Sequence, residues 1–137
     1  MTRTWMTDVA DFHHKMGQFV GDTMIPDVSV STDLRVELIR EEFEELLWAL
    51  SSKDKLGNLL SESEQIIAVA DALADLTYVI NGAAVTWGID LDAVFKTVHE
   101  SNMTKSVSQK RADGKVIKGP DYVPPDIAGA LWRATKP

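Results

Sequence analysis

The stretch SESEQIIAVADALADLTYVINGAAVTW, residues 61–87, decides the fold class because it predicts one long helix that is apolar almost all round. Ser61 followed three residues later by Glu64 matches a capping box at the start of this helix, and Gly88 suits its C-terminal cap. A helix without a wide polar face belongs in the middle of a bundle or at an interface between subunits. We therefore expect a helical protein in which this helix is either central or at an interface between subunits.

The sequence on either side predicts further helices and no alternating strand pattern before residue 115. Apolar residues recur at helical spacing in 8–20, with Asp8 near the N-cap, in about 32–52 and in about 90–102. Residues 104–126, rich in Gly, Pro and Lys, predict an extended, hairpin-like basic tail, and IAGALWR at 127–133 predicts a last turn of helix that docks it. We expect an all-α fold with a four-helix-bundle-type core.

Composition limits the architecture and the partners. A chain of 137 residues with 45% hydrophobic residues suits a single domain, residues 1–137, with a real core. It contains no Cys, no N-terminal signal pattern and no run of roughly 18 uncharged apolar residues, so we expect a cytoplasmic protein that does not cross a membrane. A net charge of −7 disfavours binding to a nucleic-acid backbone.

Acidic residues on the second predicted helix, ELIREEFEELLWAL at 37–50, fall on two different faces of a helical wheel. One face has no aliphatic neighbour and reads as solvated; it carries Glu37, Arg40 and Glu44. The other acids fall among apolar residues, and they are Glu41, Glu42 and Glu45. Three carboxylates therefore interrupt the side that a helix normally buries.

Asp71 and Asp75 are the only charged residues between Glu64 and Asp90, and they lie one turn apart on the long apolar helix. Buried carboxylates need partners, and the three glutamates of the second helix are the candidates. Arg35, near Glu42 on the wheel, could pair with one acid only. Five facing carboxylates are either partly protonated or held by metal ions. Carboxylate oxygens suit Mg²⁺ or Mn²⁺, and the sequence has no Glu-x-x-His of the kind that di-iron bundles use.

Four motifs together carry a resemblance to a known family: EEFEE at 41–45, DALADLTYVI at 71–80, VFKTVHESNMTK at 94–105 and RADGKVIKGPDYVPPD at 111–126. The chain resembles the all-α nucleoside triphosphate pyrophosphohydrolases, the MazG-like and phosphoribosyl-ATP-pyrophosphohydrolase-like proteins. The resemblance implies cleavage between the α and β phosphates of a nucleotide, two or more Mg²⁺ ions per site, and dimers or dimers of dimers.

The resemblance also implies roles for individual residues. Glu41, Glu42 and Glu45 would bind Mg²⁺, and one of them would also orient or deprotonate the attacking water. Asp75 fits the aspartate that ends the family's Glu-x-x-Asp element, but Ala72 stands where that element has its glutamate. We expect Asp71 to replace it, because Asp71 shares the stripe of Asp75 while Ala72 points away on the wheel.

Other candidates concern the nucleotide itself. Asn102 and Lys105 match residues that such enzymes use around sugar and phosphates, and Lys118 belongs to a basic tail that either clamps phosphates or is simply solvated. Tyr78 shares the acidic stripe and either packs on a ribose or fills the core. Phe12 and Trp48 are candidates for stacking on the base, although most Trp residues suit an oligomer interface. His13 and His14 are expected at the surface or in the base pocket, rather than on a metal.

These observations favour a Mg²⁺-dependent enzyme that hydrolyses a (deoxy)nucleoside triphosphate to the monophosphate and pyrophosphate, for control of the nucleotide pool or for supply of a precursor. Two alternatives stay open. One is the hydrolysis of phosphoribosyl-ATP, which the same resemblance allows. The other is an acidic helical interaction module without catalysis, which would place its glutamates on the exposed face, where Glu37 and Glu44 fall.

Overall fold

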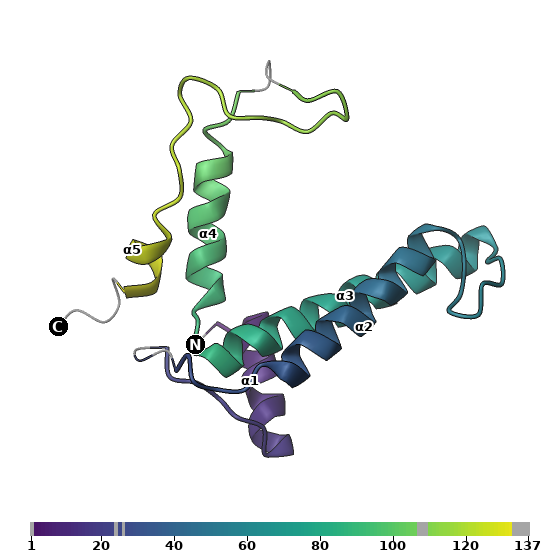
Figure 1. The fold of residues 1–137 in the computed structure, drawn as a ribbon, viewed down its shortest axis with the longest axis horizontal. Helices are drawn as coiled ribbons and strands as arrows, with labels where there is room; N and C mark the ends of the chain where they lie inside the picture. Colours follow the sequence, from purple (N-terminus) through teal and green to yellow (C-terminus); the bar gives the residue numbers. More distant parts are fainter. Residues whose placement is uncertain (1, 24, 26, 107–109, 133–137) are drawn as a thin grey trace. The chain divides into compact units, whose positions relative to one another are not determined.

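A computed structural model describes residues 2–23, 25, 27–106 and 110–132, and within them it contains five helices and no strand (Figure 1). The prediction of an all-α chain is confirmed. By internal contacts the chain divides into two compact units, 1–88 and 89–137. The helices are α1 (Trp5–Met16), α2 (Asp33–Leu50) and α3 (Glu62–Trp87) in the first unit and α4 (Leu91–Asn102) and α5 (Ile127–Trp132) in the second. The single domain and the four-helix-bundle-type core stay predictions.

The first helix starts earlier and ends earlier than the sequence pattern predicted. Thr4 is the N-cap, because its side chain accepts a hydrogen bond from the backbone N–H of Thr7 while the Thr7 hydroxyl accepts one from the N–H of Thr4. Placing Asp8 near the N-cap was therefore wrong, and its carboxylate instead pairs with Arg3. Gly17 ends the helix in the left-handed conformation, with φ of 66°.

Helices α2 and α3 are long and pack side by side (Figure 1). The predicted capping box is confirmed, because Ser61 and Glu64 exchange hydrogen bonds of 3.3 and 2.8 Å, and Gly88 closes α3 with φ of 66°. The side chain of Gln65 at the start of α3 donates to the carbonyl of Ala49 at the end of α2, over 3.0 Å. The same carbonyl also accepts a bond from the backbone N–H of Ser52, over 3.1 Å, and the bond from Gln65 ties the start of α3 to the end of α2.

The segment after α1 is held against the end of α3 by two glycines. The N–H of Gly21 donates to the carbonyl of Val85 over 2.8 Å. A Cβ on Gly21 would lie 2.5 Å from the backbone nitrogen of Gly88, so any side chain at this position would force the two segments apart. This close approach positions residues 17–22 beside α3.

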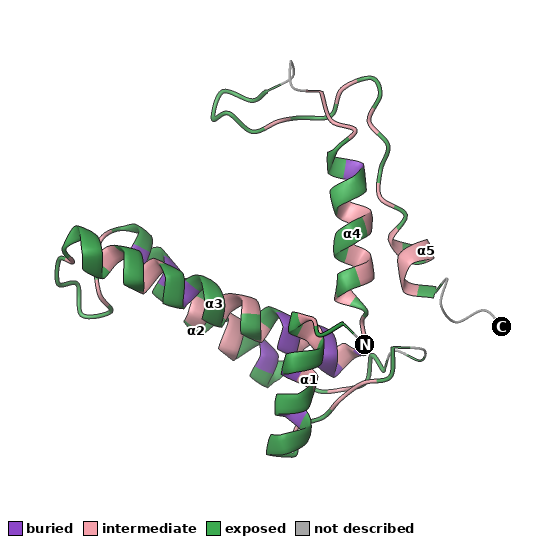
Figure 2. Ribbon diagram, turned by 180° about the vertical axis from the view of Figure 1, so that it is seen from behind, coloured by how far each residue is buried: buried purple, intermediate pink, exposed green. Residues whose placement is uncertain are grey.

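The core of the first unit is small, and much of α3 lies outside it (Figure 2). The side chains of Ile66 and Ile67 are 71% and 70% exposed. Within the described residues, α3 is the one helix that is long and apolar enough to cross a membrane, judged by length and composition alone. Helices at subunit interfaces have the same composition, so the composition of α3 is no evidence that it crosses a membrane. The buried apolar residues are Val9, Leu46, Ala49, Ala72, Ala84 and Val85.

The second unit consists of α4, the tail and α5, which packs on α4. Asp90 caps α4 by accepting a hydrogen bond from the N–H of Ala93, over 3.0 Å. In the tail, an isolated antiparallel bridge joins Lys110 to Val116. Arg133, which the sequence assigned to the last helical turn, lies outside the described residues.

Candidate active site

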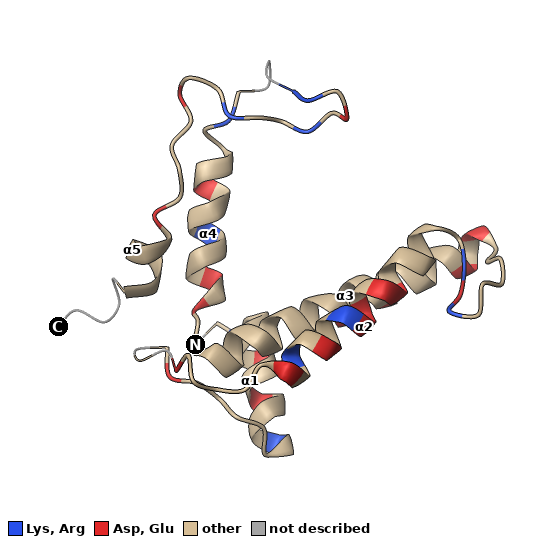
Figure 3. Cartoon of the chain, in the orientation of Figure 1, with Lys and Arg blue, Asp and Glu red and all other residues tan. Residues whose placement is uncertain are grey.

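Glu42 of α2 is the electrostatic centre of the acidic residues that the sequence singled out. Its carboxyl is half-buried, and burial is the largest cause that raises its pKa above the ordinary value of 4.5. The negative charges of four neighbouring acids raise the pKa of Glu42 further, in the order Asp75, Glu45, Glu41 and Asp71. Figure 3 shows acidic residues along α2 and α3. The structure therefore brings the four other predicted carboxylates within electrostatic range of Glu42.

We call this group the acidic cluster (Glu41, Glu42, Glu45, Asp71, Asp75), and none of its members forms an ion pair within the part of the chain that the structure describes. Lys53 and Lys55 line the same pocket as Glu45 and Asp71 without pairing with them. Among the described residues, the ion pairs of α2 and α3 are confined to the solvated face, where Arg40 bonds to Glu37 over 2.9 Å. The described side chains hold no set of three or more acids or histidines close enough to bind one metal ion. The acidic cluster is thus a row of carboxylates along two helices, whose all-oxygen character fits a hard divalent cation.

One end of the acidic cluster opens into a pocket of about 300 Å³, which we call the central pocket. Glu42 and Asp75 line it together with Tyr78 of α3 and Phe12 of α1. The rings of Phe12 and Tyr78 meet edge to face, with centroids 5.6 Å apart and planes at 81°. The structure thus brings two of the predicted nucleotide-binding aromatic residues to the same pocket as two of the predicted metal ligands.

The other end of the acidic cluster lines a second pocket of about 220 Å³, with Glu45, Asp71 and Trp48 in its walls. Phe12 and Trp48 therefore line different pockets in this structure. Ala72 lines the second pocket as well and is only 4% exposed, so the prediction that it points away was wrong. The face that α3 presents to α2 is wide enough to include both Asp71 and Ala72.

Arg35, His13 and Gln18 are site residues whose arrangement the sequence did not predict. Arg35 is 7% exposed and lines the central pocket, but its guanidinium bonds to His13 and Gln18 and not to an acid. His13 is 1% exposed, which excludes the surface position and leaves the pocket position that the sequence also allowed. The sequence signal for these contacts was an arginine among apolar residues of the second helix, and the sequence predicted for Arg35 only an ion pair with one carboxylate.

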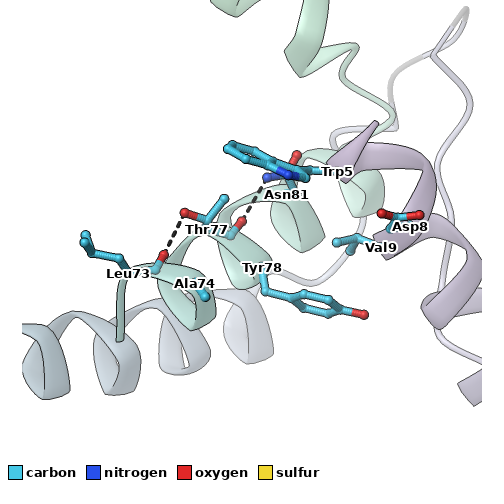
Figure 4. Close-up of a pocket in the computed structure, with 8 residues that line it drawn as sticks. All are labelled: Trp5, Asp8, Val9, Leu73, Ala74, Thr77, Tyr78 and Asn81. Atoms are coloured by element: carbon cyan, nitrogen blue, oxygen red, sulfur yellow. Dashed lines mark hydrogen bonds between the residues drawn. The ribbon is translucent and has the colours of Figure 1, made fainter. Parts of the chain in front are cut away.

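A third pocket of about 420 Å³ lies between α1 and α3, on apolar side chains such as Trp5 and Leu73 (Figure 4). The buried Asn81 at this pocket donates to the carbonyl of Thr77 over 2.9 Å, so one of its two amide hydrogens is used within α3. Tyr78 lines this pocket and the central pocket alike. The apolar lining favours contact with another apolar surface over chemistry on a phosphate.

The remaining predicted residues belong to the second unit. Asn102 is exposed at the end of α4, and Lys105 follows it in a turn. Lys105 and Lys118 line a pocket of about 390 Å³ together with Arg111 and Lys115. The ammonium of Lys118 also lies 4.9 Å from the ring centre of Tyr122. Four basic residues of the predicted tail therefore line one pocket within the second unit.

Comparison with known proteins identifies the class of protein that this fold and site define. The sequence pattern of the family described as phosphoribosyl-ATP pyrophosphohydrolase matches residues 9–102, which is more than half of the chain. The chain belongs to this family, within the MazG-like superfamily, as its motifs predicted. Membership supports the hydrolysis of a phosphoric anhydride in a nucleotide-like substrate. No curated protein matches the sequence.

The family match covers the acidic cluster, the central pocket and Asn102. It ends before Lys105, so the basic tail lies outside it. The part of the resemblance that included residues 111–126 therefore rests on the quoted sequence motif alone.

Proposed function

We propose that this protein is a Mg²⁺-dependent pyrophosphohydrolase that converts a ribo- or deoxynucleoside triphosphate and water into the nucleoside monophosphate and pyrophosphate. The observation that carries the proposal is the acidic cluster: Glu42 and the four carboxylates that raise its pKa have no ion-pair partner among the described residues. Such a surplus of negative charge suits cations, and the family match to residues 9–102 suits a phosphoric anhydride as substrate.

The chain's own residues divide the work by their chemistry. Carboxylates of the acidic cluster hold two or more Mg²⁺ ions, for which Mn²⁺ substitutes, and these ions when bound neutralise phosphate charge and activate water. One of Glu41, Glu42 and Glu45 orients the water and accepts its proton. The water oxygen bonds to one phosphorus of the α–β anhydride, the bond from that phosphorus to the bridging oxygen breaks, and the products are the nucleoside monophosphate and pyrophosphate. Phe12 and Tyr78 bind base and sugar.

Three residues of the second unit are proposed to bind phosphate oxygens of the substrate. Asn102, Lys105 and Lys118 carry donors that suit polyphosphate oxygens, and Lys105 and Lys118 line one pocket within the second unit. Trp48, which is 37% exposed beside Glu45, is a further surface for stacking. We assign this activity to the cytoplasmic nucleotide pool, because hydrolysis of a free triphosphate removes it or supplies a precursor.

We further propose that the working form is a homo-oligomer, a dimer or a dimer of dimers. The support is the exposed apolar surface of α3, which includes Ile66, Ile67 and Leu73, and the apolar pocket against α1. Covering this surface with a second copy removes it from water.

A second candidate substrate is phosphoribosyl-ATP, which is favoured by the description of the matching family. It carries the same α–β anhydride, so the same carboxylates would perform the same hydrolysis. We rank it second because the segment FHHKMG at 12–17 and the lysines of the tail are closer to the nucleotide-pool members that the motifs resemble.

A screen of the purified protein against all ribo- and deoxynucleoside triphosphates and phosphoribosyl-ATP, with Mg²⁺ or Mn²⁺, tests the proposal. Pyrophosphate is resolved from orthophosphate, and Glu42→Gln is run beside Glu37→Gln, which changes an acid on the solvated face. We expect pyrophosphate from at least one substrate, lost in Glu42→Gln and kept in Glu37→Gln. Equal activity in both variants would remove the acidic cluster from the mechanism.

A melting experiment separates the enzyme from the acidic interaction module. A cation that binds only the folded protein stabilises it by mass action, by about 2.7 kcal/mol at a hundredfold excess over its dissociation constant. We expect millimolar Mg²⁺ to raise the melting temperature of the wild type and to have less effect on Glu42→Gln. An unchanged melting temperature in the wild type would favour the interaction module.

A further inference from the structure

Three polar side chains form a hydrogen-bonded chain in the wall of the central pocket, and we call them the polar cluster (His13, Arg35, Gln18). His13 Nδ1 lies 3.0 Å from the carbonyl oxygen of Phe19. Its Nε2 lies 3.3 Å from Nη1 of Arg35, whose Nη2 donates to Oε1 of Gln18 over 3.1 Å. All three line the same pocket as Glu42.

The position of each hydrogen in the polar cluster follows from groups that can act in only one way. The Phe19 carbonyl only accepts, so Nδ1 of His13 carries the hydrogen. The guanidinium of Arg35 only donates, so Nε2 of His13 presents its lone pair. His13 is therefore neutral, and burial, the largest cause, lowers its pKa in the same sense.

The same logic orients the amide of Gln18. Because Arg35 donates, the amide oxygen must face Arg35 and the NH₂ group must face away from it. Among the described residues, no group accepts a hydrogen bond from this NH₂. Gln18 is half-buried and lines the central pocket, so this end of the pocket offers donors.

The central pocket is thus polarised. Carboxylates of Glu42 and Asp75 lie in one part of its wall, donors of Arg35 and Gln18 in another, and the ring of Tyr78 also lines it. A nucleotide has the matching order of groups, because its phosphates need cations, its base has an apolar face, and the edge of its base carries hydrogen-bonding groups.

Building on the proposed function, we propose that the polar cluster reads the edge of the nucleobase and selects keto bases over amino bases. The O4 of uracil or thymine and the O6 of guanine accept hydrogen bonds, whereas the N4 of cytosine and the N6 of adenine donate them. Donors of Gln18 and Arg35 pair with a keto oxygen, but an amino group would leave donors facing donors. Gln18 is the specificity-determining residue in this arrangement.

Uracil and cytosine nucleotides give the sharpest test, because their bases differ only in the carbonyl or amino group at position 4 and in the hydrogen on the adjacent ring nitrogen. We would titrate UMP, dUMP, CMP and dCMP into the whole protein with Mg²⁺ by calorimetry. We expect the uracil nucleotide to bind about tenfold or more tightly than its cytosine partner. Binding of neither base, or of both equally, would overturn the inference.

Two variants at one position show whether Gln18 makes the choice. Gln18→Glu keeps the shape and the bond from Arg35 but turns the outer group from a donor into an acceptor, so the preference for uracil should fall at least about tenfold and move toward cytosine. Gln18→Leu removes the outer group, so the preference should shrink without moving toward cytosine. An unchanged ratio of affinities in Gln18→Glu, with wild-type circular dichroism, would reject Gln18 as the determinant.

A pyrophosphate assay on the same preparations keeps this inference separate from the proposed function. Hydrolysis of all triphosphates at similar rates, without selective binding, would uphold the function and overturn the base selection. Selective binding of uracil nucleotides without release of pyrophosphate from any triphosphate would uphold the base selection and overturn the function.

Discussion

The backbone of Gly82 on α3 lies against the guanidinium of Arg35 on α2: a Cβ at this glycine would be 2.9 Å from Nη1. The same Cβ would be 3.3 Å from Nε2 of His13. Gly82 lines the central pocket, but the backbone fixes the direction of a Cβ, which would point at these two side chains. The missing side chain is what allows the polar cluster to reach the face of α3.

Gly82→Ala should therefore destabilise the protein by overpacking, by about 1–3 kcal/mol in the free energy of unfolding. Urea unfolding followed by circular dichroism measures the change. Arg35→Met keeps most of the stem and removes the guanidinium, so Gly82→Ala should cost less in that background. Equal costs in the two backgrounds would show that the methyl group meets something other than Arg35.

The buried His13 should lower the free energy of unfolding in acid. Its pKa is lowered in the folded protein from the ordinary 6.5, first by burial and then by the positive charge of Arg35. The unfolded chain therefore binds a proton below pH 6.5 that the folded chain does not, so the free energy of unfolding falls as the pH drops below that value. The negative groups facing the same pocket are Glu42 and Asp75.

The measurement is the urea midpoint from about pH 7.5 to about pH 5.5, compared between wild type and His13→Asn. The variant is expected to be less stable overall but to show a shallower fall with acid. His14→Asn is the matched control, because His14 is the exposed neighbour and the smallest of the causes that lower the pKa of His13, so its replacement should change the slope much less than His13→Asn does. A His13→Asn slope equal to that of wild type would contradict a neutral buried imidazole.

Glu42 should give the stability of the metal-free protein a pH dependence opposite in sign to that from His13. Its pKa is raised above 4.5 by burial and by four acids, so the folded chain holds a proton that the unfolded chain releases. Stability therefore falls as the pH rises from about 4.5 through the folded pKa. Glu42→Gln should flatten this fall and stabilise the metal-free protein at neutral pH, as measured by urea unfolding in the presence of a chelator.

Glu37→Gln provides the comparison for Glu42→Gln, since Glu37 is exposed and paired with Arg40 over 2.9 Å. A surface pair of this kind contributes little, so the variant should stay within about 1 kcal/mol of wild type at every pH. If Glu42→Gln and Glu37→Gln behaved alike, the four acids around Glu42 would not be acting on it.

A single charged residue placed on the exposed apolar face of α3 should disrupt the proposed oligomer. Ile67 is 70% exposed in the single chain, and Ile67→Glu would place a carboxylate at an interface that buries it. Light scattering coupled to size exclusion should show a smaller particle than wild type. Leu56→Glu, at a loop residue that is 80% exposed, should leave the mass unchanged. A wild-type mass in Ile67→Glu would move the interface away from this face.

Local sequence patterns predicted the helices well where a local interaction sets the boundary. The capping box of Ser61 and Glu64 was found correctly because both partners lie within four residues. The start of α1 was missed because Thr4 and Thr7 form a capping box with a hydroxyl in place of the usual Glu or Gln. A helical wheel likewise grouped Glu42 with the four acids that raise its pKa, since their spacing along α2 and α3 decides which side they share.

Contacts between segments that are distant in sequence could not be predicted in this way. Arg35 and Gln18 are seventeen residues apart and meet through a loop whose path is set by Gly21 against Gly88. No periodicity encodes that path, so the wheel offered Arg35 only an acid as its partner. The separation of Phe12 and Trp48 into two pockets has the same origin, because it depends on where α1 packs along α3.

The uncovered apolar length of α3 has a consequence for how this protein is handled. If a second copy covers it, folding and assembly share one equilibrium. The free energy of unfolding then depends on protein concentration as well as on temperature and salt. Dilution would then lower the melting temperature and the specific activity together, without any change in buffer. Comparisons between variants would have to be made at one fixed protein concentration.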